Sequence, residues 1–253
     1  MITLRGVPRE RLTECILYRI IGKIYLLTDM KCMMVMKLDL LRPFEELPYF
    51  TIAGFRQLLE DGESRDQQAR ELLWRWKRAG HILSLKRGVY MTRRFYELHR
   101  SDPDFAPAVS AILVPQSYVS LEYVLQQAGI LTEATYPVTA VTTRNTRTIE
   151  NSVGTFTYRH MKRSLYTGFS QREYYGVILD RGSVAKALFD FLYLRPLPRS
   201  LRAEDLDLAE DLRLNLDEFS PEDIIEFKRH VEIGDSEKMN FIMDNLRRTV
   251  WQP

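Results

Sequence analysis

The hydrophobic residues between positions 64 and 80 recur at the spacing of an amphipathic helix. The apolar positions of this segment, at i, i+3, i+4 and i+7, are Ala69, Leu72, Leu73 and Trp76. This spacing predicts a helix over residues 64–79 with one buried face. Ser64 and Gln67 have the form of a capping box at its start, and Gly80 is expected just beyond its end.

Shorter elements flank this helix on both sides. Apolar residues predict a first helix that stops at Pro48, and Thr51 is the expected N-cap of a second helix. The residues expected on the buried side of that second helix are Phe55, Leu58 and Leu59. Two strands, over residues 82–85 and 89–92, follow the long helix, with a basic turn at Lys86-Arg87-Gly88. Three helices and a basic hairpin predict a winged helix-turn-helix over residues 37–100.

A second unit is predicted over residues 105–195, after a linker at Ser101–Asp104. Its pattern predicts helices at 106–113 and 183–193, a short helix capped by Ser120 and stopped by Gly129, and strands at 138–143, 155–160 and 176–179. The last part, residues 196–253, is acidic and helical in pattern, and Ser220-Pro221 is a strong helix start. The expected fold class is therefore α+β: a winged helix-turn-helix, a mixed α/β domain and a C-terminal helical segment.

Residues 1–36 have no pattern of either unit. Charged residues interrupt every apolar run, so that none approaches the ~20 residues of a transmembrane helix, and no signal-peptide cleavage site follows. Four methionines crowd its end: Met30, Met33, Met34 and Met36. We interpret this stretch as an extension that precedes the true start of translation, for example at Met36. The alternative is a genuine N-terminal helix, for instance one used in dimerisation.

The charge is distributed unevenly along a chain whose net charge is only +2. Residues 56–100 contain 11 Lys/Arg against 6 Asp/Glu, and residues 141–172 contain 6 against 1. Residues 201–245 reverse this balance, with 14 acidic and 5 basic side chains. Such polarity suggests two surfaces with different partners, although solvated faces explain a single charge run equally well. For the acidic region we favour a solvated helical cap over a docking surface for a basic partner or a shield over the DNA-binding face.

The basic first unit has the residue types for duplex recognition. A helix reads base edges in the major groove with polar side chains, while a basic hairpin neutralises phosphates. The expected base readers are Ser64, Gln67, Gln68 and Glu71, and Arg65 could contact either bases or phosphate. The expected phosphate contacts are Arg75, Lys77, Arg78, Lys86, Arg87, Arg93 and Arg94. The alternative is a winged helix that binds protein rather than DNA. Trp74 on the exposed face fits neither function cleanly.

The second unit adds a further basic stretch and one charged pair. The basic residues are Arg144, Arg147, Arg159, Lys162 and Arg163, which could extend the DNA contact or meet an acidic partner. Lys186 and Asp190 lie i, i+4 on a predicted helix, where an ion pair contributes a few tenths of a kcal/mol. We group both residues with this basic stretch as a candidate antitoxin or second basic surface, and we favour a structural role for the pair over a catalytic one. His160 is likewise expected to be structural or RNA-facing.

No motif for catalysis, cofactor or metal binding accompanies these residues. The chain lacks a phosphate loop and the HExxH, GxSxG and CxxC patterns, and its two cysteines lack zinc-type spacing. We therefore expect no enzyme activity, no cofactor and no metal. Two cysteines are too few for a disulfide framework and are typical of a reducing, cytoplasmic location.

Several short motifs resemble, in their order and spacing, those of the AbiEi antitoxins of type IV toxin–antitoxin systems, which act in abortive infection. The resemblance covers about residues 44–195. The motifs that carry it are Trp76…Ala79-Gly80…Arg87-Gly88-Val89-Tyr90, Ser117-Tyr118-Val119-Ser120-Leu121-Glu122 with Gly129, Val141-Thr142-Thr143, Phe156-Thr157-Tyr158-Arg159-His160, and Lys186-Ala187-Leu188-Phe189-Asp190. The family usually has an acidic residue before the Lys-Ala pair, where this chain has Ala185.

The resemblance implies an N-terminal winged helix that binds operator DNA and represses its own operon. It also implies a second domain that counteracts a nucleotidyltransferase-like toxin encoded by an adjacent gene. A stand-alone winged-helix regulator without a toxin is the first alternative. A nucleic-acid-processing enzyme that uses Lys186, Asp190 and His160 is the second. Neither a membrane partner nor a particular oligomeric state is expected from the sequence.

Overall fold

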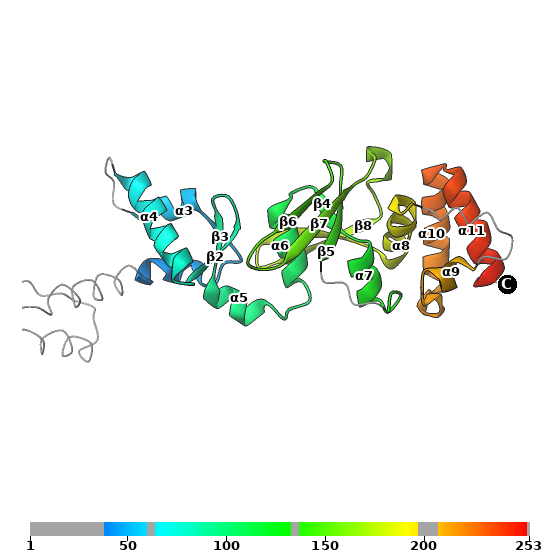
Figure 1. The fold of residues 1–253 in the computed structure, drawn as a ribbon, viewed down its shortest axis with the longest axis horizontal. Helices are drawn as coiled ribbons and strands as arrows, with labels where there is room; N and C mark the ends of the chain where they lie inside the picture. Colours follow the sequence, from blue (N-terminus) through cyan, green and yellow to red (C-terminus); the bar gives the residue numbers. More distant parts are fainter. Residues whose placement is uncertain (1–37, 60–63, 133–136, 197–206, 252–253) are drawn as a thin grey trace, which may run out of the picture.

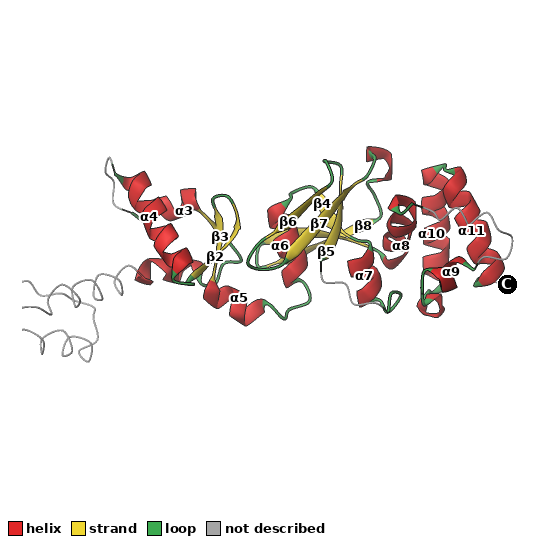
Figure 2. Ribbon diagram, viewed as in Figure 1, coloured by secondary structure: helices red, strands yellow, loops and turns green. Residues whose placement is uncertain are grey.

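The computed structural model describes residues 38–59, 64–132, 137–196 and 207–251, and the expected extension at residues 1–36 lies outside them. The chain forms a mixed α+β fold in which a small helical unit, a six-stranded sheet and a group of C-terminal helices follow one another (Figures 1 and 2). Within the described residues, no helix combines the length and the apolar character that would be needed to cross a membrane.

The N-terminal unit contains helices and a three-stranded antiparallel sheet. Its elements are η1 (Asp39–Phe44), β1 (Phe50–Thr51), α3 (Ile52–Arg56), α4 (Arg65–Arg78), β2 (Ile82–Lys86) and β3 (Val89–Thr92). The strand order is β1-β3-β2. A core of its own holds the helices on the sheet, and Phe55 and Trp76 pack edge to face within it, with ring centroids 5.1 Å apart. The expected helix at 64–79 and both expected strands of the hairpin are confirmed.

The predictions for the first two helices are only partly confirmed. Thr51 caps α3 as expected, by accepting a hydrogen bond from the Gly54 amide at 3.0 Å. The first helix is a 3-10 helix that ends before Pro48, and Pro43 lies inside it. The prediction for Leu58 is wrong, because α3 ends at Arg56 and leaves this side chain 42% exposed.

The two ends of α4 differ in how well the sequence predicted them. The capping box at Ser64 is wrong: Ser64 has ψ 5°, outside the extended region that an N-cap usually adopts, and its side chain caps no amide. The prediction for Gly80 is confirmed. Gly80 has φ +79°, and the amides of Gly80 and His81 donate to the carbonyls of Lys77 and Trp76, which is the Schellman pattern.

The central sheet has the order β6-β7-β5-β4-β9-β8. Its strands are β4 (Ser117–Val119), β5 (Val138–Thr142), β6 (Arg147–Glu150), β7 (Thr155–His160), β8 (Phe169–Tyr174) and β9 (Val177–Gly182). The pairs β5–β7 and β4–β9 are parallel, and the other neighbours are antiparallel. The pattern missed β4, which is buried throughout, and the edge strands β6 and β8, which are largely exposed and show no regular alternation.

Helices cover both faces of this sheet. The helices are α6 (Phe105–Leu113), α7 (Glu122–Gln127) and α8 (Val184–Leu194). Tyr158 of β7 bonds Ser110 of α6 on one face, whereas Tyr118 of β4 bonds Asp190 of α8 on the other. The expected cap at Ser120 is wrong, because Leu121 with φ +60° precedes α7 and the Ser120 hydroxyl donates to Asp190 instead. Gly129 does end the helix, with φ +73°.

The remaining helices continue the same core. They are α5 (Arg93–His99) between the first two units, and α9 (Leu208–Asp211), η4 (Leu216–Glu218), α10 (Pro221–Gly234) and α11 (Glu237–Thr249) at the C-terminal end. Helix α10 starts at Ser220-Pro221 as predicted, and Ser220 and Asp223 form a full capping box there. One hydrophobic cluster runs from Leu85 and Phe95 through the sheet to Leu246. The core therefore crosses both expected boundaries, near residues 100 and 195.

Candidate nucleic-acid interface

Helix α4 turns a polar and mostly basic face to solvent. Its apolar residues face the N-terminal core, and at about 100° per residue the opposite side is centred on Gln67, Glu71, Trp74 and Arg78. The exposed side chains of this face are Gln67, Gln68, Arg70, Glu71, Trp74, Arg75, Lys77 and Arg78. Ser64 lies exposed before the first turn, where its hydroxyl accepts a bond of 3.4 Å from Gln68. A groove-binding helix needs this combination of amide and guanidinium donors.

Some of these side chains already have partners within the helix. Arg75 forms an ion pair with Glu71 one turn earlier, and both are about half exposed. The guanidinium of Arg78 lies over the Trp74 ring, 5.4 Å from its centroid, which accounts for a tryptophan that is 59% exposed. This cation–π contact keeps the exposed Arg78 side chain against the surface of the helix.

Three polar side chains of α4 have no hydrogen bond, ion pair or ring contact among the described residues: Gln67, Arg70 and Lys77. Sequence reasoning missed Arg70, because its position at the border of the buried face gave it no place in the exposed stripe. Arg70 is exposed in the structure and adds a cation one turn before Trp74. Gln67, Arg70 and Lys77 can each form a new hydrogen bond to a ligand without breaking one within the protein.

Arg65 departs from the expected base or phosphate contact. Its side chain is only partly exposed, and its Nε donates to the backbone carbonyl of Arg56 at 2.6 Å. Arg56 in turn pairs with Asp66 at 2.9 Å. These two contacts tie the start of α4 to the end of α3. Arg65 therefore sets the angle between the two helices, and its Nε is not available to DNA.

Lys86 also departs from the expectation. Its ammonium donates to the carbonyls of Ile112 and Leu113, at 2.6 and 3.1 Å, and so binds the C-terminal end of α6. Burial, and then the charge of Arg144, lower the pKa of Lys86. The hairpin turn is further fixed by Asn151, which donates to the carbonyl of Leu85 at 3.1 Å. The β2–β3 hairpin thus docks on the second unit, and Arg87 remains as its exposed cation.

Arg93 and Arg94 lie in the first turn of α5, below the hairpin. Arg93 pairs with Glu97 at 2.8 Å and is 50% exposed, and Arg94 pairs with Glu45 at 3.6 Å and is 67% exposed. Exposed pairs of this kind are weak and exchange readily for other partners. Both arginines can therefore still contact phosphate, but their local carboxylates reduce the charge that they present.

The basic stretch of the second unit does not form one surface. Arg147 of β6 lies opposite Tyr158, on the sheet face covered by α6. Arg159 follows Tyr158 along β7 and so points to the other face, where it donates to the Leu194 carbonyl at 3.5 Å. The sequence brought Arg147 and Arg159 into one basic run, and the sheet separates them.

The other basic residues of this stretch also lie at separate places in the fold. Arg144 follows β5 and donates to Gln116 at 3.4 Å, next to the hairpin. Lys162 reaches α10 and donates to the Gly234 carbonyl at 3.4 Å, and Arg163 begins the short helix η2 (Arg163–Leu165) nearby. His160 is exposed and contacts the Arg144 carbonyl at 3.1 Å.

Lys186 and Asp190 form the expected ion pair, but their place on a second basic surface is wrong, since neither has exposed surface. Asp190 also accepts hydrogen bonds from the Tyr118 and Ser120 hydroxyls, both at 2.8 Å. Burial raises the pKa of Asp190 and lowers that of Lys186, while each partner's charge acts against that shift. The pair joins α8 to β4 inside the core. Neither side chain touches solvent or His160, as a shared catalytic site would require.

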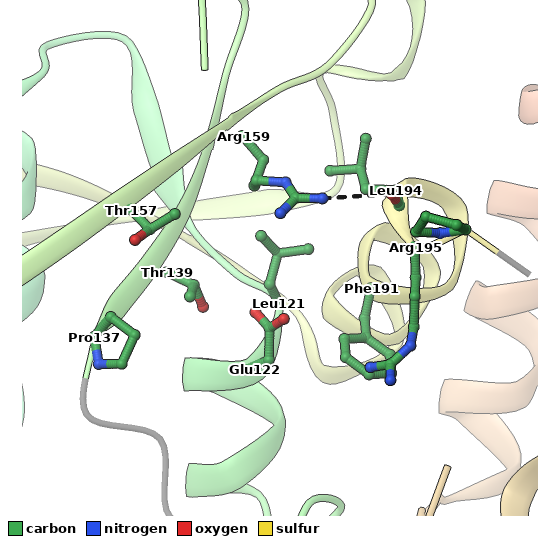
Figure 3. A pocket seen from close by; sticks show the side chains of 10 residues that line it. Leu121, Glu122, Pro137, Thr139, Thr157, Arg159, Phe191, Leu194 and Arg195 are labelled. Atoms are coloured by element: carbon green, nitrogen blue, oxygen red, sulfur yellow. Dashed lines mark hydrogen bonds between the residues drawn. The ribbon is translucent and has the colours of Figure 1, made fainter. Parts of the chain in front are cut away.

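A groove of about 730 Å³ lies between the sheet face of β5 and β7, the start of α7 and the end of α8 (Figure 3). Its walls include Leu121, Glu122, Arg159, Phe191 and Arg195. Figure 3 shows the Arg159 guanidinium on one side of Leu121 and the Arg195 side chain against Phe191 on the other. The two guanidinium groups thus do not converge on a common point. No sequence pattern indicated this groove, because its lining comes from four separate elements.

Comparison with known proteins adds no identification. No protein-family model matches the chain, and no curated protein matches it significantly. Within the described residues, no group of histidine, cysteine, aspartate and glutamate side chains is arranged to hold a metal ion.

Proposed function

We propose that this protein binds double-stranded DNA through its N-terminal unit, which acts as a winged helix-turn-helix. The observation that carries the proposal is the exposed face of α4, where Gln67, Arg70 and Lys77 have no partner within the described residues. Helix α4 enters the major groove, with Gln67 and Gln68 at base edges. Arg70, Lys77 and Arg87 contact phosphates on either side.

The order of elements supports this proposal. Helix η1, strand β1, helices α3 and α4, and then the β2–β3 hairpin follow one another as in winged helices, and β1 completes the sheet beside β3. Helix α4 is the element after the turn, the usual position of a recognition helix. It is also long enough to cross a groove, since 14 residues span about 21 Å at 1.5 Å per residue.

The experiment compares duplex binding by matched charge variants at several salt concentrations. The Arg70→Ala/Lys77→Ala variant loses two cations from α4, and Lys228→Ala/Arg229→Ala loses two from α10, at the opposite end of the molecule (Figure 1). Each lost phosphate contact lowers the salt slope by about 0.9. We expect a slope lower by about 1.8 for the α4 variant and no change for the α10 variant.

Sequence readout requires a separate measurement. Gln67→Ala removes an amide that can bond an adenine edge, so it should reduce preference for the specific site by about 1–3 kcal/mol while non-specific binding stays constant. Upstream DNA of the protein's own gene and a scrambled duplex of the same length supply the two affinities. Equal slopes for both charge variants, or no duplex binding by the unaltered protein, would exclude DNA recognition by α4.

We further propose, from the resemblance to AbiEi antitoxins, that this DNA binding represses the protein's own operon. On the same basis, the second unit counteracts a nucleotidyltransferase-like toxin. The proposal includes no catalytic step by this chain, which agrees with the burial of Lys186 and Asp190. Co-expression with the product of the adjacent gene, with growth as the readout, tests the antitoxin part. Growth arrest that this protein does not relieve, or an adjacent product without toxicity, favours a stand-alone regulator.

A further inference from the structure

Cations from two units of the fold meet where the β2–β3 hairpin contacts the sheet. The hairpin supplies Lys86 and Arg87, and the chain after β5 supplies Arg144. Lys86 is fixed on the α6 carbonyls, and Arg144 donates to Gln116, the residue just before β4. The two like charges are close enough for Arg144 to lower the pKa of Lys86, after the larger effect of burial.

No carboxylate balances these charges among the described residues. Arg144 donates only to the Gln116 amide oxygen and Arg147 only to the Asn145 carbonyl, both at 3.4 Å, and neither has an ion pair. Like charges held together without a counterion raise the free energy of the folded protein. An external anion at this place therefore relieves a repulsion as well as forming new contacts.

The same side of the sheet carries Arg147. Its cross-strand partner Tyr158 bonds Ser110 of α6, and α6 is the helix on which Lys86 docks. In Figure 1 the hairpin and α6 lie next to each other between α4 and the sheet. Arg87 is therefore next to Lys86 in the hairpin turn, the charge of Arg144 acts on Lys86 from the chain after β5, and Arg147 lies on the face of the sheet that α6 covers.

The composition of this surface favours a nucleic-acid backbone over a protein. Residues 144–148, Arg-Asn-Thr-Arg-Thr, are all exposed and include no apolar or aromatic side chain. Protein interfaces have an apolar core, whereas DNA interfaces are polar and positively charged. Hydroxyl, amide and guanidinium donors at successive positions match a row of phosphate oxygens.

We propose that Arg144 and Arg147 continue the phosphate-binding surface from the hairpin turn onto the sheet, so that the second unit contacts the DNA backbone beside the site bound by α4. This inference rests on the proposed function and extends it. It makes the second unit part of the DNA footprint, because Lys86 and Asn151 hold the hairpin and the sheet in a fixed relation. The added contacts are independent of base sequence.

The test uses the full chain and a duplex that contains the specific site. Arg144→Ala/Arg147→Ala should lower the salt slope by about 1.8 and weaken specific and scrambled duplexes by the same factor. Lys228→Ala/Arg229→Ala removes the same charge from α10 and should change neither. When the duplex is shortened stepwise on the hairpin side, the unaltered protein should lose affinity to the level of the Arg144/Arg147 variant, which itself should lose little.

The outcomes separate this inference from the proposed function. If Arg70→Ala/Lys77→Ala weakens binding and Arg144→Ala/Arg147→Ala behaves like the α10 control, the second unit does not contact DNA and the inference is wrong, while the function stands. If the Arg144/Arg147 variant keeps its DNA affinity but no longer binds an acidic partner protein, the surface is a protein interface. If the unaltered protein binds no duplex, both proposals fall. Since the six arginine and lysine side chains replaced in these three variants are all exposed, unchanged thermal unfolding serves as the folding control.

Discussion

Replacing Lys186 with methionine should destabilise this protein far more than an ordinary i, i+4 ion pair would suggest. The Lys186 and Asp190 side chains have no exposed surface, so Lys186→Met leaves a buried carboxylate with only the Tyr118 and Ser120 hydroxyls as donors. Breaking a buried pair by removing one partner costs about 3–5 kcal/mol. That is a large part of a total stability of about 5–15 kcal/mol.

The exposed pair Lys228–Glu232 on α10 provides the matched comparison. It has the same spacing along its helix, but its side chains are 53% and 65% exposed and 3.9 Å apart. Lys228→Met should therefore cost less than about 0.5 kcal/mol. Urea unfolding at neutral pH, followed by circular dichroism, gives both free energies from the transition midpoint as long as the slope with urea stays constant.

A double-variant cycle separates the ion pair from the packing of the lysine chain. Asp190→Asn keeps an acceptor for Tyr118 and Ser120 but removes the charge, so the double variant Lys186→Met/Asp190→Asn should cost less than the sum of the two single variants. The expected coupling is about 2–3 kcal/mol, the upper end for residues in contact. A Lys186→Met cost no larger than that of Lys228→Met, or no coupling, would show that water reaches the pair and that the core is not closed around it.

Three further perturbations test other parts of the core. Burial lowers the pKa of His230 below its usual 6.5, against the opposing effect of Glu226. The contribution of this group to stability is therefore present above pH 6.5 and is lost as the pH falls through the folded-state pKa. The urea midpoint of the His230→Gln variant should depend less on pH between 7.5 and 5 than that of the unaltered protein. Gly168→Ala, at φ +78°, would place a Cβ 2.5 Å from His230 Cε1 and should lower the stability by about 2–4 kcal/mol. Gly176→Ala, at φ +76° with nothing within 4 Å, should lower it by only about 1 kcal/mol. Equal shifts of the thermal unfolding midpoint for the two variants would contradict this. Lys86→Met should lower stability by about 1–3 kcal/mol through the lost bonds to α6, while Arg87→Ala should stay within about 0.5 kcal/mol in the same urea assay.

The local pattern predicted those elements that one short segment determines. The buried stripe of α4, its end at Gly80 and the helix start at Ser220-Pro221 all depend on residues within a few positions of one another. Strand β4 escaped prediction because its three residues are all buried and show no alternation. The capping box predicted at Ser64 does not form, because the backbone at Ser64 is not extended. The two residues that follow, Arg65 and Asp66, contact Arg56, which lies outside the short segment on which the prediction was based.

The sequence by itself determined the order of α3, α4, β2 and β3 in the first unit, though not β1 or α5, together with the basic character of α4 and the hairpin and the pairing of Lys186 with Asp190. Each follows from helical or strand periodicity along the chain. Only the tertiary structure decided which of these charges are accessible. It buried Lys186, committed Lys86 to α6 and separated Arg147 from Arg159 across the sheet. The physical reason is that solvent access depends on neighbours distant in sequence, which no local spacing records.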